Sequence, residues 1–368
     1  MINALPLQAQ KGRGAVSNAS GRFEATTTVA VDDGWQAEHH RPALRTTVTD
    51  ERPKTVITRN QSPDVPFDRS LNPYRGCEHG CVYCFARPTH AYQGLSPGLD
   101  FESRLFAKPD APEILEQQLR KPGYKPATLA MGTNTDPYQP IERSREITRG
   151  VLDVLDRFNH PTAIVTKSDL ILRDLDILSN MAARGLVSVA LSVTTLDRAL
   201  ARRMEPRAAS PTKRLHAVRA LADAGVPVSV MVAPIIPAIN DHEVENILAA
   251  AAGSGAAGAD YILLRLPGEV KALFSEWLGR HYPDRANKAL ALMADHIGNP
   301  KSGQLYNAAW GRRMRGDGAY AALLAKRFAI ACRQLGLNQK AAREYRHRTD
   351  IFSPPPLPPK AGDQLSLF

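Results

Sequence analysis

The feature that most constrains this chain is a regular alternation of two kinds of segment between about residues 65 and 267. Short apolar runs rich in β-branched residues are followed by longer stretches with apolar residues at helical spacing. Parallel strands need such crossover helices, so the pattern predicts an α/β fold closed into a full or partial barrel. Strands are expected in the runs at 69–75, 127–133, 162–168, 187–193, 226–234 and 260–266.

The composition changes on either side of this body. Residues 1–60 lack sustained periodicity and are expected to form an irregular or disordered basic arm. Residues 61–268 form the predicted barrel, and three amphipathic stretches within 269–350 predict a C-terminal helical extension. Residues 351–368 contain SPPPLPPKAGD, which predicts a semi-rigid polyproline spacer ahead of the last five residues.

Composition and charge limit the class of protein. With 43% hydrophobic residues among 368, the chain can bury a sizeable core. It has no run of 18 apolar residues and no start of signal-peptide type, so we expect a cytoplasmic protein with no membrane partner. The formal charge of +10 permits contact with a polyanion and does not identify one.

Three of the four cysteines fall within eight residues, at Cys77, Cys81 and Cys84. Their C-x3-C-x2-C spacing lets one tight loop wrap three thiolates around a metal centre, and thiolates suit iron-sulfur clusters and zinc alike. Zinc would need a fourth ligand, for which His79 and His90 are nearby, so a zinc site stays open as the alternative. A cubane held by three thiolates would leave one iron open for chemistry. Cys332 lies among apolar residues and is expected to be buried in a helix.

The motif C-x3-C-x-aromatic-C after a first strand, with Tyr83 as the aromatic residue, resembles the radical S-adenosylmethionine (SAM) superfamily. SLNPYRGCEHGCVYCFARPTHAY, TNTDPYQPIE, SVTTLD, EPRAASPTKRL and VAPIIPAIND together resemble the branch containing spore photoproduct lyase and the DNA repair photolyase-like proteins. The resemblance covers about residues 60–270. It implies a partial (β/α)6 TIM-like barrel, a [4Fe-4S] cluster, SAM chelated by the open iron, and an electron donor such as flavodoxin or ferredoxin. SAM is then cleaved reductively to a 5′-deoxyadenosyl radical.

Polar residues at the strand ends are the candidates for SAM contacts. Radical SAM proteins bind the methionine amino group after the second strand, and Lys167 would neutralise the carboxylate at the end of the third. For Asp136 an Asx turn before Pro137 is the alternative, and for Lys167 a solvated surface position. The predicted cofactor residues are Tyr83, Thr133, Asn134, Asp136, Lys167, Ser192 and Thr194.

A basic loop beyond the fourth strand suggests a polyanionic substrate, although an ordinary solvated loop is the alternative for each of its residues. The predicted nucleic-acid contacts are Arg202, Arg203, Arg207, Lys213 and Arg214. With the resemblance, they imply a lyase-like enzyme acting on DNA lesions. The alternatives are a radical SAM enzyme acting on RNA, a peptide or a small molecule, and a non-catalytic zinc-stabilised adaptor for the sliding clamp.

One departure from spore photoproduct lyase concerns its hydrogen donor. That enzyme uses an additional cysteine downstream of the cluster and within the barrel, whereas no cysteine lies between Cys84 and Cys332 here. Repair of the same thymine lesion by the same route is therefore not implied. Tyr138 is a candidate substitute for the missing donor.

The last five residues, QLSLF, match the peptide by which bacterial replication and repair proteins dock on the β sliding clamp. A glutamine would bond at the rim of the clamp groove while apolar side chains fill its pockets. A tail folded back onto the core is the alternative. The predicted partner-binding residues are Gln364, Leu365, Ser366, Leu367 and Phe368.

Overall fold

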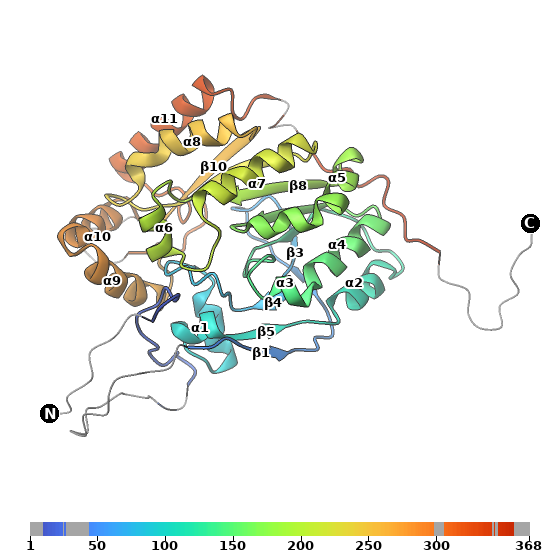
Figure 1. Ribbon diagram of the computed structural model, residues 1–368, viewed down its shortest axis with the longest axis horizontal. Helices are drawn as coiled ribbons and strands as arrows, with labels where there is room; N and C mark the ends of the chain where they lie inside the picture. The colour runs from blue at the N-terminus through green and yellow to red at the C-terminus, as the bar shows by residue number, and fades with distance from the viewer. Residues whose placement is uncertain are drawn as a thin grey trace, which may run out of the picture.

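A seven-stranded sheet with the strand order β10-β9-β8-β7-β6-β3-β2 forms the body of the protein (Figure 1). The computed structural model describes residues 10–24, 26, 44–297, 305–340, 342 and 345–356. The strands of both its sheets are β1 (Thr47–Asp50), β2 (Ile57–Arg59), β3 (Arg69–Leu71), β4 (Tyr74–Arg75), β5 (Arg104–Ala107), β6 (Leu129–Met131), β7 (Thr162–Thr166), β8 (Val187–Ser192), β9 (Val228–Ile235) and β10 (Gly258–Leu263).

Helices alternate with these strands along the chain. The α-helices are α1 (Leu99–Ser103), α2 (Ala111–Leu119), α3 (Glu142–Arg145), α4 (Ile147–Arg157), α5 (Leu175–Ala183), α6 (Arg198–Met204), α7 (Pro211–Asp223), α8 (Val244–Gly253), α9 (Val270–His281), α10 (Pro283–Ile297) and α11 (Gly318–Gln334). The 3₁₀ helices are η1 (Arg87–Gln93), η2 (Asp169–Asp174) and η3 (Asp241–Glu243). Within the residues that the structure describes, none of the helices is long and apolar enough to cross a membrane.

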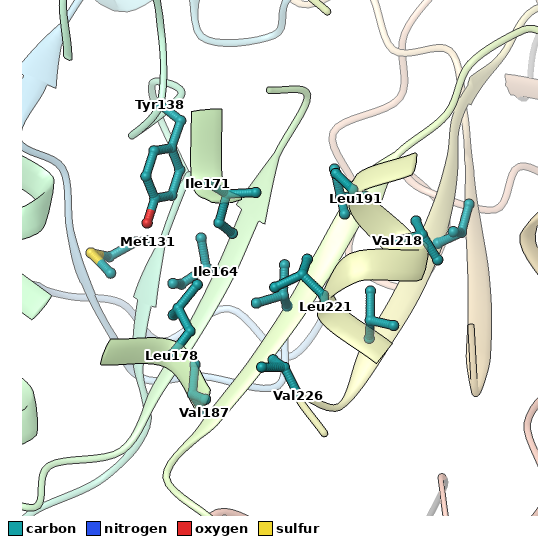
Figure 2. Packing of buried hydrophobic residues seen from close by; sticks show 14 of the residues in the cluster. Met131, Tyr138, Ile164, Ile171, Leu178, Val187, Leu191, Val218, Leu221 and Val226 are labelled. Atoms are coloured by element: carbon teal, nitrogen blue, oxygen red, sulfur yellow. The ribbon is translucent and has the colours of Figure 1, made fainter. Parts of the chain in front are cut away.

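The predicted partial barrel is confirmed. Each of the six runs expected to be strands overlaps one, and β3, β6, β7, β8, β9 and β10 pair in parallel in chain order. Alternate residues of a strand point to opposite faces, so β8 buries Val187, Val189 and Leu191 under the helices. Figure 2 shows Leu191 facing Val218 and Leu221 of α7. The carboxyl ends of the six strands consequently meet at one end of the barrel.

The segment expected to be an irregular arm, residues 1–60, has more structure than its composition indicates. It contains β1, which pairs in parallel with β5, and β2, which extends the main sheet antiparallel to β3. Residues 13–17 are buried against the body. Such short strands are missed because four residues are too few to reveal a period, and their partners are distant in the sequence.

The helical extension shares its packing with the barrel. Phe328 of α11 packs against Tyr261 of β10 with ring centroids 4.7 Å apart and ring planes tilted by 47°, and Cys332 is buried in α11 as predicted. Helices α9 and α10 pack in a second apolar cluster that includes Cys81 and Tyr83. The extension therefore supports the cysteine loop directly, while the boundary at 268 stays a prediction.

A segment over residues 305–317 lies along the open edge of the barrel, and we call it the seam segment. The amide of Leu263 donates to the carbonyl of Met314 over 2.9 Å, which continues the pairing beyond β10. On the other side, the amide of Gly311 donates to Asp64 over 2.7 Å, and Arg313 pairs with the same carboxylate. The seam segment thus joins the last strand to the loop between β2 and β3.

The start of the predicted polyproline spacer is held against the barrel rather than extended away from it. Phe352 packs near the rings of Phe158 and His160, and the Arg120 side chain donates to the carbonyl of Pro355 over 2.7 Å. A spacer function can therefore begin only beyond residue 356. The predicted clamp-binding residues 364–368 lie outside the described residues.

Acidification is expected to weaken this region through His160. The ring is fully buried, accepts from the Tyr124 hydroxyl at Nε2 over 2.8 Å and donates from Nδ1 to the Pro161 carbonyl over 3.0 Å. Burial lowers the pKa of His160 from 6.5 to about 4. Between these values the unfolded chain binds the extra proton, so stability is complete above pH 6.5 and declines as the pH falls toward 4.

The expected loss from this one group is about 2.5 kcal/mol between pH 7 and pH 4.5. Urea unfolding gives the free energy of unfolding of the wild type and of His160→Gln at both pH values. The loss due to His160 is the difference between the pH dependence of the two proteins. Equal pH dependence in the two proteins would contradict the assignment.

Candidate functional site

The cysteine loop lies across the carboxyl ends of the barrel strands. The amide of Cys77 donates to the carbonyl of Phe101 over 2.9 Å, and that of Val82 donates to the carbonyl of Met204, beyond β8, over 3.0 Å. Thr135, beyond β6, donates to the carbonyl of Gly76 over 2.7 Å. This is the end of a parallel barrel where active sites form, because the loops from all strands converge there.

The three thiols form a donor set that suits a positively charged metal centre. Burial raises the pKa of Cys77 and Cys81. Each is raised further by a carboxylate, Asp136 for Cys77 and Glu205 for Cys81, and by at least one neighbouring thiol. Three thiolates so close together are stable only when a cation balances them, as coordination does. The three cysteines therefore fit the metal-binding role predicted for them.

A cluster and a single zinc ion place different demands on the positions of the three thiols. In the part of the chain that the structure describes, no three His, Cys, Asp or Glu side chains are placed to hold a single metal ion. A cubane does not require this convergence, because each of its thiolates binds a different iron. Of the two histidines considered as a fourth zinc ligand, His79 pairs with Asp136 at 3.3 Å and His90 packs edge-on against Phe101.

A buried carboxylate, Glu102, anchors the cysteine loop to the N-terminal segment. It pairs with Arg87 and accepts from the amides of Gly14 and Ala15 over 2.9 and 2.8 Å. Arg87 in turn donates to the carbonyl of Cys81 over 2.9 Å. The sequence offered no signal for this network, because its members are separated by up to 88 residues.

Replacing Gly14 by alanine is expected to loosen the cysteine loop. A Cβ at this position would lie 1.8 Å from the carbonyl oxygen of Gly80, a backbone atom that cannot move aside cheaply. We expect reconstituted Gly14→Ala protein to lose iron to a chelator several times faster than the wild type, followed by absorbance of the cluster. Gly253→Ala in α8, where no atom lies within 4 Å, is the matched control. Equal rates in both variants would contradict the role of this segment.

Asp136 connects the end of β6 with the end of β7 and with the cysteine loop. Its carboxylate accepts from the Thr166 hydroxyl over 2.7 Å and from the Lys167 amide over 2.8 Å, besides pairing with His79. Burial alone would raise the pKa of Asp136, but His79 and these hydrogen bonds lower it to about 2. The predicted alternative, an Asx turn, is also present, because the carboxylate accepts from the Tyr138 amide.

Thr133 and Asn134, predicted to contact the cofactor, lie together beyond β6 and are bound by one asparagine. Asn72 donates to the Thr133 hydroxyl over 3.0 Å and accepts from the Asn134 amide over 3.0 Å. Both residues stay partly exposed. They can therefore contact a ligand. The Asp136 carboxylate cannot do so as readily, because it already accepts hydrogen bonds from Thr166 and Lys167.

Lys167 lies next to the cysteine loop. Its ammonium is 5.9 Å from the centre of the Tyr83 ring, and it is close enough to Cys81 to favour ionisation of that thiol. Lys167 is partly buried, and in the described residues it makes no ion pair with a carboxylate within 4 Å. The predicted alternative of a solvated surface lysine does not fit this position.

Glu205 organises the side chains around Tyr83. It accepts from the Tyr83 hydroxyl, pairs with Arg214, and accepts from the Thr194 hydroxyl over 3.0 Å. Burial would raise the pKa of Glu205, but Arg214 and Lys167 lower it, so the carboxylate stays ionised. Ser192 is buried beside this group, and its carbonyl accepts from Arg214 over 2.9 Å.

Within the described residues, the basic loop leaves only part of its cations without a carboxylate partner. Arg214 is buried in its pair with Glu205, which corrects its predicted role as a surface contact. Arg207 pairs with Glu78 at 3.1 Å and Lys213 with Asp169 at 3.2 Å. The other two side chains, Arg202 and Arg203, are exposed, and Arg203 donates to the Tyr282 hydroxyl.

Tyr138 is not placed to act as a hydrogen donor. Its ring is completely buried in the apolar layer between sheet and helices, near Met131 and Ile171 (Figure 2). A side chain enclosed in this layer has no exposed surface for a substrate radical to reach. The candidate substitute suggested by the sequence is therefore wrong.

Comparison with known proteins identifies the barrel. A model of the radical SAM superfamily matches residues 71–251. An uncharacterised protein of Mycobacterium tuberculosis is 37% identical over 226 residues, which are 61% of this chain and 66%, just under two thirds, of the relative. An uncharacterised protein of Methanocaldococcus jannaschii is 29% identical over 47% of this chain and 62% of its own length.

The fold is similar to solved structures of spore photoproduct lyase. One, complexed with dinucleoside spore photoproduct, matches with a TM-score of 0.55 and 15% identity over 79% of this chain and 80% of the lyase. Another, a mutant with bound AdoMet and the same dinucleoside, matches with a TM-score of 0.54 and 16% identity over the same shares. Residues 71–251, which carry the cysteine motif at the carboxyl ends of the strands, therefore match the radical SAM domain, and the cofactors of that superfamily are a [4Fe-4S] cluster and SAM.

Proposed function

We propose that this chain cleaves SAM reductively and uses the resulting radical on nucleic acid, with damaged DNA as its substrate. The observation that carries the proposal is the enclosed loop of three cysteines beside Lys167 and Tyr83, at the end of the barrel where the strands terminate. The solved lyases with a dinucleoside photoproduct support the substrate class, as does the formal charge of +10.

The three cysteines would hold the cluster through their thiolates, and the remaining iron would bind SAM. When bound, the cluster supplies the electron that cleaves SAM into methionine and a 5′-deoxyadenosyl radical. Lys167 is assigned to the SAM carboxylate, because it lacks a carboxylate partner within the described residues and lies near Cys81. Tyr83 forms the wall beside it, held by Glu205.

The other predicted cofactor residues divide into two groups. Thr133 and Asn134 are partly exposed and can donate to or accept from SAM directly. Asp136 and Thr194 act as positioning residues, since their polar atoms already bind His79 and Glu205. Ser192 is assigned a hydrogen bond to SAM through its hydroxyl, which lies beside this network.

Anaerobic reconstitution tests the proposal. Protein loaded with iron and sulfide and reduced with dithionite should release 5′-deoxyadenosine from SAM, and lesion-bearing DNA should stimulate the release above undamaged DNA, RNA and peptide. Flavodoxin or ferredoxin should replace dithionite. Stimulation by RNA or peptide alone would move the enzyme to another substrate class. A colourless protein that carries zinc and releases no deoxyadenosine would leave the adaptor function instead.

We propose further that residues 364–368 dock on the bacterial β sliding clamp, which would deliver the enzyme to DNA. Deleting these five residues is expected to reduce clamp binding at least tenfold, since apolar anchors carry most of the affinity of such peptides. SAM cleavage without DNA should not change. Surface plasmon resonance on immobilised clamp measures clamp binding, and deoxyadenosine release measures SAM cleavage. An unchanged clamp affinity would contradict the docking function.

A further inference from the structure

Three exposed aromatic side chains lie around the loop that follows β10, next to the cysteine loop. Phe85 directly follows Cys84 and is 45% exposed, while Tyr92 at the end of η1 is 66% exposed and Phe23 is 56% exposed. Phe23 and Tyr92 contact each other, with ring centroids 5.2 Å apart. Aromatic rings gathered in water at one place mark a binding surface more often than a chance arrangement.

Arginine side chains accompany these rings. Arg265 lies over Phe85 with its guanidinium carbon 4.4 Å from the ring centre, and Arg22 lies over Phe23 and Tyr92 at 5.2 and 5.6 Å. In a guanidinium stacked on a ring, the N–H groups at the edge stay free to bind a phosphate. The aromatic side chains therefore come with cations already in place.

Arg265 differs from most arginines of this protein in lacking an anion. Within the described residues, no carboxylate lies within 4 Å of it, and the carboxylate in its neighbourhood, Asp64, is held by Arg313 and the Gly311 amide. Burial is the main cause that lowers the pKa of Arg265, and the nearby Arg313 lowers it further, although Tyr306, Cys84 and Asp64 act in the opposite direction. A partly buried cation beside another cation is a site that an anionic ligand would complete.

The loop after β10 contacts both the Phe85 ring and the Arg22 side chain that lies over Phe23 and Tyr92, so these groups lie on one surface. Arg265 reaches Phe85 from the start of this loop, and Glu269 at its end pairs with Arg22 at 3.6 Å. Between them, a Cβ on Gly268 would lie 3.6 Å from Pro88 of η1. We call the set Arg22, Phe23, Phe85, Tyr92 and Arg265 the rim.

We propose that the rim binds unpaired nucleotides of a single-stranded or locally opened nucleic acid, with bases stacked on the aromatic rings and a phosphate on Arg265. This inference rests on the proposed function and names the surface through which the substrate is held. Stacking and phosphate binding together are the chemistry of single-strand recognition, in which each base offers a face and each nucleotide a charge. A strand bound there would pass directly beside Cys84.

The rim adds a further cation for nucleic acid to the two of the basic loop, Arg202 and Arg203, that have no carboxylate partner in the described part of the chain. Arg207, Lys213 and Arg214 are paired with carboxylates, so binding there would have to break an ion pair. Arg265 needs no such exchange. Enzymes that act on a base must also take it out of the stacked duplex, and exposed rings offer an alternative stacking partner to the bases released.

Fluorescence anisotropy with the full-length, cluster-loaded protein tests this proposal. The probe is a fluorescein-labelled 12-nucleotide single-stranded DNA of mixed sequence, with the same sequence as a duplex for comparison. We expect the single strand to bind more tightly than the duplex, and Phe85→Leu and Tyr92→Leu each to raise its Kd about fivefold or more. Arg265→Gln should reduce the slope of log K against log salt by about 0.7. Leu323→Ala, an equally exposed apolar side chain on α11, should change nothing.

The outcomes separate this inference from the proposed function. Wild-type protein that binds neither form of DNA at low salt would overturn both. Wild-type binding that all three rim variants retain would overturn the rim alone. If Arg265→Gln weakens SAM binding and leaves the salt slope unchanged, Arg265 belongs to the SAM site. If the variants bind DNA normally but flavodoxin no longer reduces their cluster, the rim is the binding surface for the electron donor and the proposal is wrong. Iron content and circular dichroism of each variant show whether it is folded.

Discussion

Replacing Cys81 by serine is expected to abolish cluster binding and SAM cleavage. A serine hydroxyl is a poor ligand for the iron of a cluster, and only three protein thiolates are available on this loop. Iron per chain after anaerobic reconstitution should fall from about four to below one, and deoxyadenosine release should fall to the background without protein. The visible absorbance of the cluster and product chromatography measure the two effects.

The fourth cysteine provides the control for this experiment. Cys332 is buried in α11, where the side chain of Asn338 lies 3.7 Å from its sulfur, and it belongs to the main core rather than to the cysteine loop. Cys332→Ala should therefore retain iron and activity, at a cost in stability of about 1 kcal/mol for the lost packing. Full iron loading in Cys81→Ser, or loss of iron in Cys332→Ala, would contradict the assignment of the ligands.

Replacing Glu205 by glutamine is expected to lower the free energy of unfolding by about 3 to 5 kcal/mol. The change leaves the guanidinium of Arg214 buried without its anion and removes the charged acceptor of the Tyr83 hydroxyl. Because Tyr83 lies next to Cys81 and Cys84, SAM binding should weaken as well. Urea unfolding of the reconstituted protein measures stability, and equilibrium dialysis measures SAM.

A matched substitution separates burial from charge. Glu116 of α2 pairs with Arg120 and Arg157 near the surface, and Glu116→Gln should cost less than about 1 kcal/mol. The double variant with Glu205→Gln and Arg214→Met should be more stable than Glu205→Gln, because it removes the uncompensated charge. A change in Glu205→Gln as small as that in Glu116→Gln would show that the buried pair does not organise the site.

The fold class could be predicted from the sequence because it depends on local pattern. Each strand of the barrel buries one face under a helix, so Val187, Val189 and Leu191 alternate with smaller residues. This alternation can be recognised from the sequence alone. The cysteine motif could be found for a similar reason, since one loop carries all three ligands. The position of Lys167 at a strand end could be predicted because it follows directly on an apolar run.

Residues that act through distant partners could not be found in this way. Glu102 and Glu205 are single carboxylates without a repeated spacing, and their roles come from Gly14 and Tyr83, which lie 88 and 122 positions away. Arg214 was misassigned for the same reason, because a run of basic residues does not show which member is buried. The rim likewise joins side chains from three separate segments.

The sequence by itself therefore determined the barrel, the position of the cysteine loop and the resemblance to the radical SAM superfamily, since each depends on residues close together along the chain. Only the tertiary structure decided which charges are neutralised and which are left for a ligand. Ion pairing and burial depend on distances between segments that the order of residues does not specify. For that reason the predicted basic loop proved largely engaged with carboxylates, while Arg265 beside Cys84 was left without one.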